Sequence, residues 1–157
     1  MAADGPIFLP YLLGNRDNPN ACAGWSGLRQ YHNRGDLLRA VYEGVALSHR
    51  HQLEYLLVNR ESPKEICFAG GVAHSHVWRQ IFADVLGIPL RIVASEEMGA
   101  KGAAITAAVA AGFYDDIRDA VKGMVRPGSL IVPDGDSAAV YDRKYEVFRR
   151  RITNADD

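Results

Sequence analysis

Two adjacent glycines, Gly70 and Gly71, followed by Ser75, form the pattern in this sequence with the clearest potential for chemistry. Glycines remove the side chains that would keep a ligand away from the backbone, and N–H groups at the start of a helix attract anions. A phosphate or the edge of a nucleotide could therefore lie against this turn, beside the Ser75 hydroxyl. A Gly-Gly turn between a strand and a helix also occurs for steric reasons alone, so spacing favours neither interpretation.

The glycine turn does not match either of the common phosphate-binding motifs. It has no Gly-Lys-Ser/Thr and is therefore not a P-loop. It also lacks the third glycine and the second spacing of the dinucleotide-binding fingerprint. The turn alone therefore identifies no ligand.

Two pairs of histidines and Ser75 are candidates for metal binding or catalysis. His49 and His51 are two residues apart, as are His74 and His76, so the members of each pair face different sides of a helix and no metal site is predicted. Ser75 lacks the Gly-X-Ser-X-Gly pattern of a hydrolase nucleophile, which leaves a hydrolase poorly supported.

Two other pairs have a structural and a functional interpretation. Asp36 and Glu43 lie seven residues apart, on one helix face, but helix capping and hydrogen bonding at the edge of the core are favoured over paired catalytic carboxylates. Trp25 and Trp78 are assigned to the core rather than to stacking on a ligand.

The turn is positioned by a predicted strand, helix and strand. An apolar run at 66–69 precedes it, apolar residues at helical spacing follow over 75–86, and a second extended run covers 88–93 after the helix stop at Gly87. This order predicts a right-handed crossover with two parallel strands.

Further elements are predicted on either side of this unit. Before it lie an extended segment at 6–13, a short strand at 23–28 and a long helix with Asp36 as its N-cap. After it lie a buried small-residue helix at 98–111 and a shorter helix at 115–124. An extended stretch at 130–132 and a terminal helix at 137–152, capped by Ser137, complete the order.

The composition limits the class of partner. The chain has 157 residues, with 18 Lys plus Arg against 19 Asp plus Glu and a net charge of −1, which gives no reason to expect nucleic acid or a membrane. The one basic cluster is interpreted as a solvated face of the terminal helix. Its members are Arg143, Lys144, Arg149, Arg150 and Arg151. Cys67 is expected to be a core thiol, and two cysteines without metal spacing predict a reducing compartment. No leader or membrane span is seen, so a cytoplasmic location is expected.

Several separate stretches resemble the C-terminal domain of the FGGY family of carbohydrate kinases. They are 8–16, 23–28, 36–44, 70–80, 83–87 and 102–108. The stretch 23–43 is similar to the second signature of the family throughout, and 70–80 resembles its adenosine motif. The likeness covers residues 6 to about 134.

The resemblance implies a fold and an activity. The fold would be α/β and ribonuclease-H-like, as in actin and sugar kinases, with a mixed sheet flanked by helices. It implies that Gly70, Gly71 and Ser75 contact the nucleotide, and that ATP, Mg²⁺ and a small sugar take part. Within the family, the motifs look closest to kinases for ketopentoses, particularly L-xylulose.

Two features of the family are missing from this sequence. They are the sugar-binding domain, with its catalytic aspartate and first phosphate loop, and the Thr-Gly-Thr loop expected before Gly5. We therefore expect residues 1–157 to be a C-terminal nucleotide-binding domain that is incomplete at its N-terminal hairpin, has no catalytic residue of its own and is inactive alone. Because the first hairpin is incomplete, we expect an open sheet edge. Such an edge favours self-association or pairing with an N-terminal kinase domain. The alternative is a non-catalytic binding or assembly module.

Overall fold

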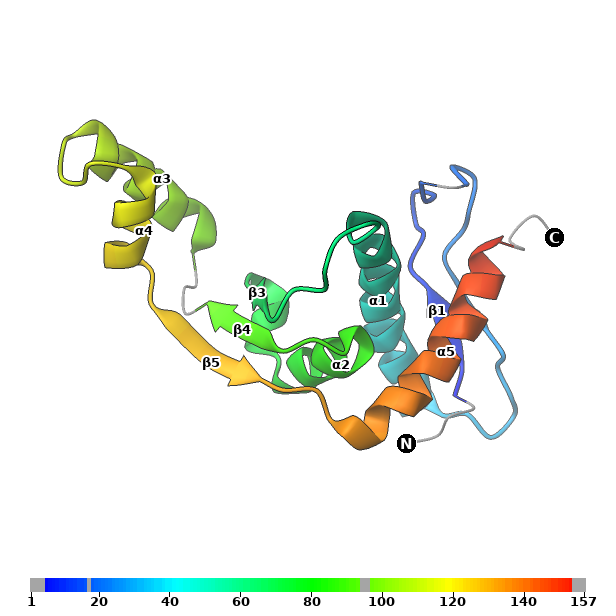
Figure 1. Ribbon diagram of the computed structural model, residues 1–157. Coiled ribbons are helices and arrows are strands. Elements are labelled where there is room, and N and C mark those ends of the chain that lie inside the picture. Colours follow the sequence, from blue (N-terminus) through cyan, green and yellow to red (C-terminus); the bar gives the residue numbers. More distant parts are fainter. Residues whose placement is uncertain (1–4, 17, 94–96, 154–157) are drawn as a thin grey trace.

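The computed structural model describes residues 5–16, 18–93 and 97–153. Figure 1 shows that α1 (Arg34–Leu56), α2 (His76–Leu86) and α5 (Gly135–Thr153) gather in one body with the N-terminal strands. The helices α3 (Met98–Ala110) and α4 (Ile117–Met124) lie at the far end of the central strands, and we call these two helices the arm. None of the helices in the described ranges has the length and apolarity needed to cross a membrane.

The N-terminal strands lie against α1. The strand β1 (Ile7–Leu9) pairs antiparallel with β2 (Gly24–Ser26), and Phe8 lies opposite Trp25. A Cβ atom at Gly44 of α1 would lie 2.2 Å from the carbonyl oxygen of Phe8, so only glycine allows the helix to approach β1 this closely. Trp25 packs on the ring of Phe8 but is 46% exposed, so its assignment to the core was wrong.

The start of α1 is fixed by two side chains. The Asn33 side chain accepts hydrogen bonds from the N–H groups of Gly35 and Asp36, and the Asp36 carboxylate accepts one from the N–H of Asn33 at 2.8 Å. This reciprocal arrangement is a capping box. The N-cap is therefore Asn33, and the prediction of Asp36 as N-cap was wrong by three residues, although Asp36 does contribute to capping.

The central sheet is mixed and has the order β3-β4-β5. The strand β3 (Ile66–Phe68) pairs parallel with β4 (Leu90–Val93), and α2 joins them, which confirms the predicted crossover. The strand β5 (Pro127–Ile131) pairs antiparallel with β4 and is longer than the extended stretch expected at 130–132. Among the described strands, β3 has β4 as its sole neighbour, so the expected open edge is present.

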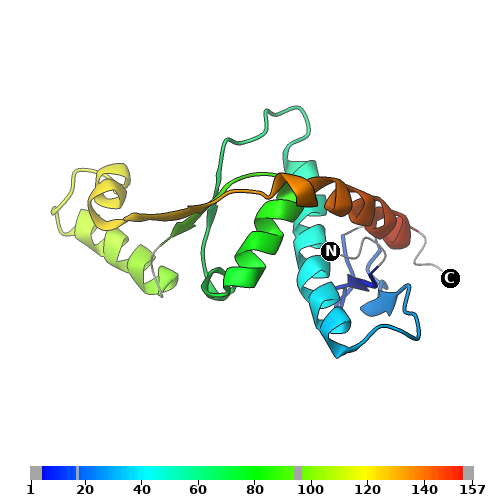
Figure 2. The same ribbon diagram turned by 90° about the horizontal axis from the view of Figure 1, so that it is seen from below.

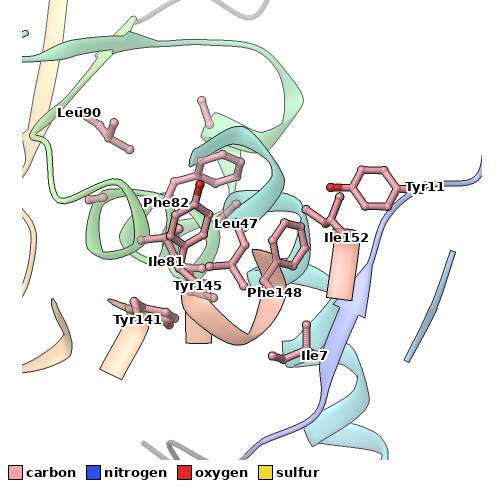
Figure 3. Packing of buried hydrophobic residues seen from close by; sticks show 14 of the residues in the cluster. Ile7, Tyr11, Leu47, Ile81, Phe82, Leu90, Tyr141, Tyr145, Phe148 and Ile152 are labelled. Carbon is pink, nitrogen blue, oxygen red and sulfur yellow. The ribbon is translucent and has the colours of Figure 1, made fainter. Parts of the chain in front are cut away.

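The core lies between α1, α2 and α5 (Figure 3). Leu47 of α1, Phe82 of α2 and Phe148 of α5 are each no more than 2% exposed. The helix α5 begins at Gly135, so Ser137 lies inside it and is not its N-cap. Instead, the Asp134 carboxylate accepts from the Asp136 N–H at 3.2 Å and from the Ser137 hydroxyl at 2.9 Å.

A buried ionic cluster joins α1 to α5. The Glu43 carboxylate, 2% exposed, accepts hydrogen bonds from Lys144 Nζ at 2.5 Å, Arg39 Nε at 2.7 Å and the Tyr141 hydroxyl at 3.2 Å. Burial and the neighbouring Glu43 carboxylate raise the pKa of Tyr141 to about 12. The hydrogen-bonding role expected for Glu43 is confirmed, whereas Lys144, 5% exposed, does not belong to a solvated face.

The arm departs most from the sequence expectations. In α3 only Ile105 is buried, and in α4 only Ala120, because these two helices pack mainly on each other (Figure 2). The prediction of a buried small-residue helix was therefore wrong for the described chain. Cys67 is also exposed rather than in the core. Ile66 and Phe68 pack against the core, so the alternation of strand side chains points Cys67 to the uncovered face of the sheet.

Candidate functional site

The Gly70 turn leads from β3 into α2. Gly70 has a φ of 89°, a conformation that residues with a side chain rarely adopt, so glycine is required here. A short 3₁₀ helix, η1 (Gly71–His74), then precedes α2, and the N–H of Ala73 donates to the carbonyl of Gly70 at 3.0 Å. The sequence predicted the strand, the turn and the helix but not this intervening 3₁₀ turn.

Gly71 has no structural requirement within the described chain. Its φ is not positive, and a Cβ atom placed on it would meet no other atom within 4 Å. The residue is exposed, as is Gly70. Neither backbone conformation nor packing therefore explains a glycine at position 71, whereas close approach of a ligand to the backbone would.

Ser75 has a structural role that accounts for a serine at this position. It is the N-cap of α2, and its hydroxyl oxygen accepts a hydrogen bond from the N–H of Trp78 at 3.3 Å. A hydroxyl that accepts one hydrogen bond keeps its own hydrogen as a donor. Ser75 can therefore cap the helix and still donate to a ligand at the turn.

The turn is held firmly on one side and open on the other. Val72 and Ala73 pack with the core, and the Trp78 indole Nε1 donates to the carbonyl of Tyr42 at 3.2 Å. The Trp78 ring also stacks on that of Tyr42, with 4.9 Å between ring centroids. Trp78 thus packs against the core as expected and anchors α2 to α1, which fixes the position of the glycines.

The open side offers binding groups rather than a catalytic set. His74 and His76 are exposed, and the first turn of α2 presents backbone N–H groups that have no partner within the helix. In the ranges that the structure describes, no group of three or more His, Cys, Asp or Glu side chains is arranged to hold a metal ion. The geometry supports binding of an anion or a polar ring edge.

Arg79 was not identified from the sequence. It lies four residues after Ser75, on the same face of α2, and within the described part of the chain its buried Nε has no hydrogen-bond partner. A guanidinium near a helix N-terminus adds to the positive character of this region. The i, i+4 spacing between Ser75 and Arg79 was the signal that could have indicated it.

Comparison with known proteins gives a consistent result. Residues 1–111 match the family described as FGGY family of carbohydrate kinases, C-terminal domain. An L-xylulose/3-keto-L-gulonate kinase from Escherichia coli K12 is 34% identical over 146 residues, which is 93% of this chain and 29% of that protein.

Solved structures agree with the sequence matches. A xylulose kinase from Rhodospirillum rubrum superposes with a TM-score of 0.81 at 40% identity, over 96% of this chain and 30% of that one. A gluconate kinase from Lactobacillus acidophilus gives 0.85 at 26% identity, over 99% and 32%. The ribonuclease-H-like α/β fold of sugar kinases is therefore confirmed. The present chain spans about 30% of the length of these relatives.

Proposed function

Because this chain belongs to the FGGY family of carbohydrate kinases, we propose that residues 1–157 form the C-terminal nucleotide-binding domain of an ATP-dependent sugar kinase. Such an enzyme transfers the γ-phosphate of ATP to a sugar hydroxyl, and Mg²⁺ neutralises charge on the phosphates when it is bound. Among the described residues, no cluster of three or more His, Cys, Asp or Glu side chains is arranged to hold this ion.

Gly71 is the observation that carries the nucleotide site. Gly70 is required by its φ, and Ser75 by helix capping, but Gly71 is explained by neither conformation nor packing. We assign Gly70 and Gly71 to backbone contact with the adenosine part of ATP, and the Ser75 hydroxyl to a hydrogen bond with it. A side chain at position 71 would occupy the space that the nucleotide needs.

The proposed sugar is a ketopentose such as L-xylulose. The support is sequence similarity to proteins named L-xylulose/3-keto-L-gulonate kinase and xylulose kinase. Similarity of fold does not select the sugar, because a gluconate kinase superposes equally well.

No residue among 1–157 is assigned to catalysis. The described turn contains binding groups but no carboxylate placed to take a proton from a sugar hydroxyl, and phosphoryl transfer depends on such positioning together with charge stabilisation. Relatives are about three times as long as this chain, which leaves room for those groups elsewhere in the enzyme. We therefore propose that the 157-residue chain alone binds ATP but does not phosphorylate sugars.

Calorimetric titration with ATP tests the nucleotide site. We expect Gly71→Leu to lower the amount of ATP that the chain binds, because the site at the turn is lost. The matched control is Gly135→Leu, at an exposed glycine whose Cβ would also meet nothing within 4 Å and whose φ is not positive. Equal binding by all three proteins would contradict the site. A coupled assay with L-xylulose and D-xylulose tests whether the chain alone phosphorylates sugars. Turnover by the pure chain would contradict the proposed inactivity.

The open edge of β3 and the exposed face of α3 are proposed as contact surfaces for further kinase polypeptide. Sheet edges left without a partner tend to pair with another chain. In the absence of that polypeptide, we expect the 157-residue chain to self-associate. A constant monomer mass in light scattering across a wide concentration range would contradict this proposal.

A further inference from the structure

A groove is lined by residues of the first 31 positions and of α5, and no residue of α2 or of the Gly70 turn contributes to its lining. Its volume is about 870 Å³, and it runs between the β1–β2 segment and α5. The charged side chains that line it are Arg29, Arg143, Lys144, Glu146, Arg150 and Arg151. Five basic groups thus face one acidic group, in a chain whose net charge is −1.

The basic groups converge on the groove from two distant parts of the sequence. Arg143, Arg150 and Arg151 lie seven and eight residues apart on α5, a spacing that places them on one helix face. Arg29 follows β2 and reaches the same groove from the other wall. The fold therefore gathers charges that the sequence alone left on a solvated helix.

Most of this positive charge is not neutralised inside the protein. Lys144 is paired with Glu43, and the Glu146 carboxylate lies 3.7 Å from Arg149. In the described ranges, Arg29, Arg143, Arg150 and Arg151 take part in no ion pair.

Helix electrostatics explain only part of the cluster. Arg150 and Arg151 lie in the last turn of α5, where cations are favourable beside the carbonyl end of the helix dipole. Arg143 lies more than a turn away from that end, and Arg29 belongs to another segment. Gathering four guanidinium groups around one groove raises the electrostatic free energy of the folded chain, and a bound anion would lower it.

We propose that this groove binds a small organic anion that carries two or more phosphate groups. Arginine forks match phosphate oxygens with paired hydrogen bonds, and the volume lies in the range of small-ligand sites. The Tyr31 and Ser26 side chains, which also line the groove, supply neutral hydroxyl groups. The site is separate from the Gly70 turn, so it does not depend on the proposed nucleotide site.

Titration of the 157-residue chain with tripolyphosphate at low ionic strength tests the proposal. We expect Arg143→Gln combined with Arg150→Gln to weaken binding about tenfold or more, because each removes a charge-assisted contact. Arg29→Gln, on the opposite wall, should weaken it severalfold. The matched control combines Arg60→Gln with Arg118→Gln, two exposed arginines outside the groove, and should leave the affinity unchanged.

Titrations with other ligands distinguish the possible anions. A pentose 5-phosphate carries one phosphate group and should bind more weakly than ADP or tripolyphosphate. The affinity of ADP for the groove should be unchanged in the Gly71→Leu protein and should weaken about tenfold or more in the Arg143→Gln, Arg150→Gln protein. If that double variant loses helical circular dichroism, Arg29→Gln alone decides. An equal loss in the control pair, or no binding of tripolyphosphate to the unaltered chain, would overturn the proposal.

Discussion

The helix α3 of the arm is richer in apolar residues than the helices of the body, yet it is far less buried. In the body, Leu47 and Phe148 are no more than 1% exposed, and three helices share one core. In the arm, α3 is made almost entirely of alanine, glycine and other apolar residues, yet Ile105 is its only buried residue. The apolar content of a helix therefore does not determine its burial. Burial depends on which other elements pack against the helix, and α3 packs mainly on α4.

The largest expected effect is on the free energy of unfolding, and one variant in the body is compared with one variant at the arm. Phe148→Ala, in the body, should lower the free energy of unfolding by about 3–5 kcal/mol, because it leaves a cavity in a closed core. Phe113→Ala, beside α3, should change it by less than about 0.5 kcal/mol, because Phe113 is 79% exposed.

Urea denaturation followed by tryptophan fluorescence measures both variants, since Trp25 belongs to β2 and Trp78 to α2, which are both elements of the body. Circular dichroism at low urea concentration shows whether each protein starts folded. Equal losses for the two variants would mean that the arm shares the core of the body, and the contrast between the regions would fail.

A second effect concerns the ionic cluster that joins α1 to α5. Glu43→Gln should lower the free energy of unfolding by about 3 kcal/mol, because it leaves the buried ammonium of Lys144 without a charged partner. Glu43→Leu combined with Lys144→Met should recover much of this loss, since removal of both charges avoids the desolvation cost.

The control for the cluster is Glu61→Gln, on the exposed connection after α1, which should have little effect. Urea denaturation at neutral pH measures all of these proteins. If the double variant were less stable than Glu43→Gln, Lys144 would not be the cause of the loss.

The sequence predicted the elements whose apolar spacing is regular. The strands β3 and β4 and the helix α2 follow from periodicity, and their parallel pairing follows from chain connectivity. The strand β5 was underestimated because Pro127 and Gly128 are poor strand formers, and only pairing with β4 reveals it. The cap at Asn33 was missed because Asp36 is an equally good capping residue and spacing does not distinguish them.

The part of the candidate site that the sequence predicted is the turn, because backbone conformation alone determines where glycine is needed. A glycine pair after a strand indicates a turn, and Gly70 does have the positive φ that glycine allows. The other details depend on three-dimensional contacts. They include the 3₁₀ turn at 71–74, the hydrogen bond from Trp78 to the Ser75 hydroxyl, and the buried Nε of Arg79. Burial was least predictable of all, as Cys67 and α3 illustrate, because it depends on what covers a surface.

The smallest effect compares two helix caps of the same kind. Asn33 caps α1 in the body, and Asp116 caps α4 in the arm, where its carboxylate accepts from the N–H of Asp119 at 2.9 Å. Replacing either cap by alanine removes a partner from the first turn of a helix, a loss of about 1 kcal/mol in typical proteins. In the body that loss should appear in global unfolding, because α1 carries core residues and packs on β1, α2 and α5.

In the arm the same loss should remain local. The helix α4 packs mainly on α3, so it can open without the core, and such openings have their own lower free energy. We therefore expect Asp116→Ala to speed amide hydrogen exchange in α4 while urea denaturation of the body stays within about 0.5 kcal/mol. Asn33→Ala should instead shift the urea midpoint and leave exchange in α4 unchanged. A shift of the urea midpoint by Asp116→Ala equal to that by Asn33→Ala would mean that the arm unfolds together with the body.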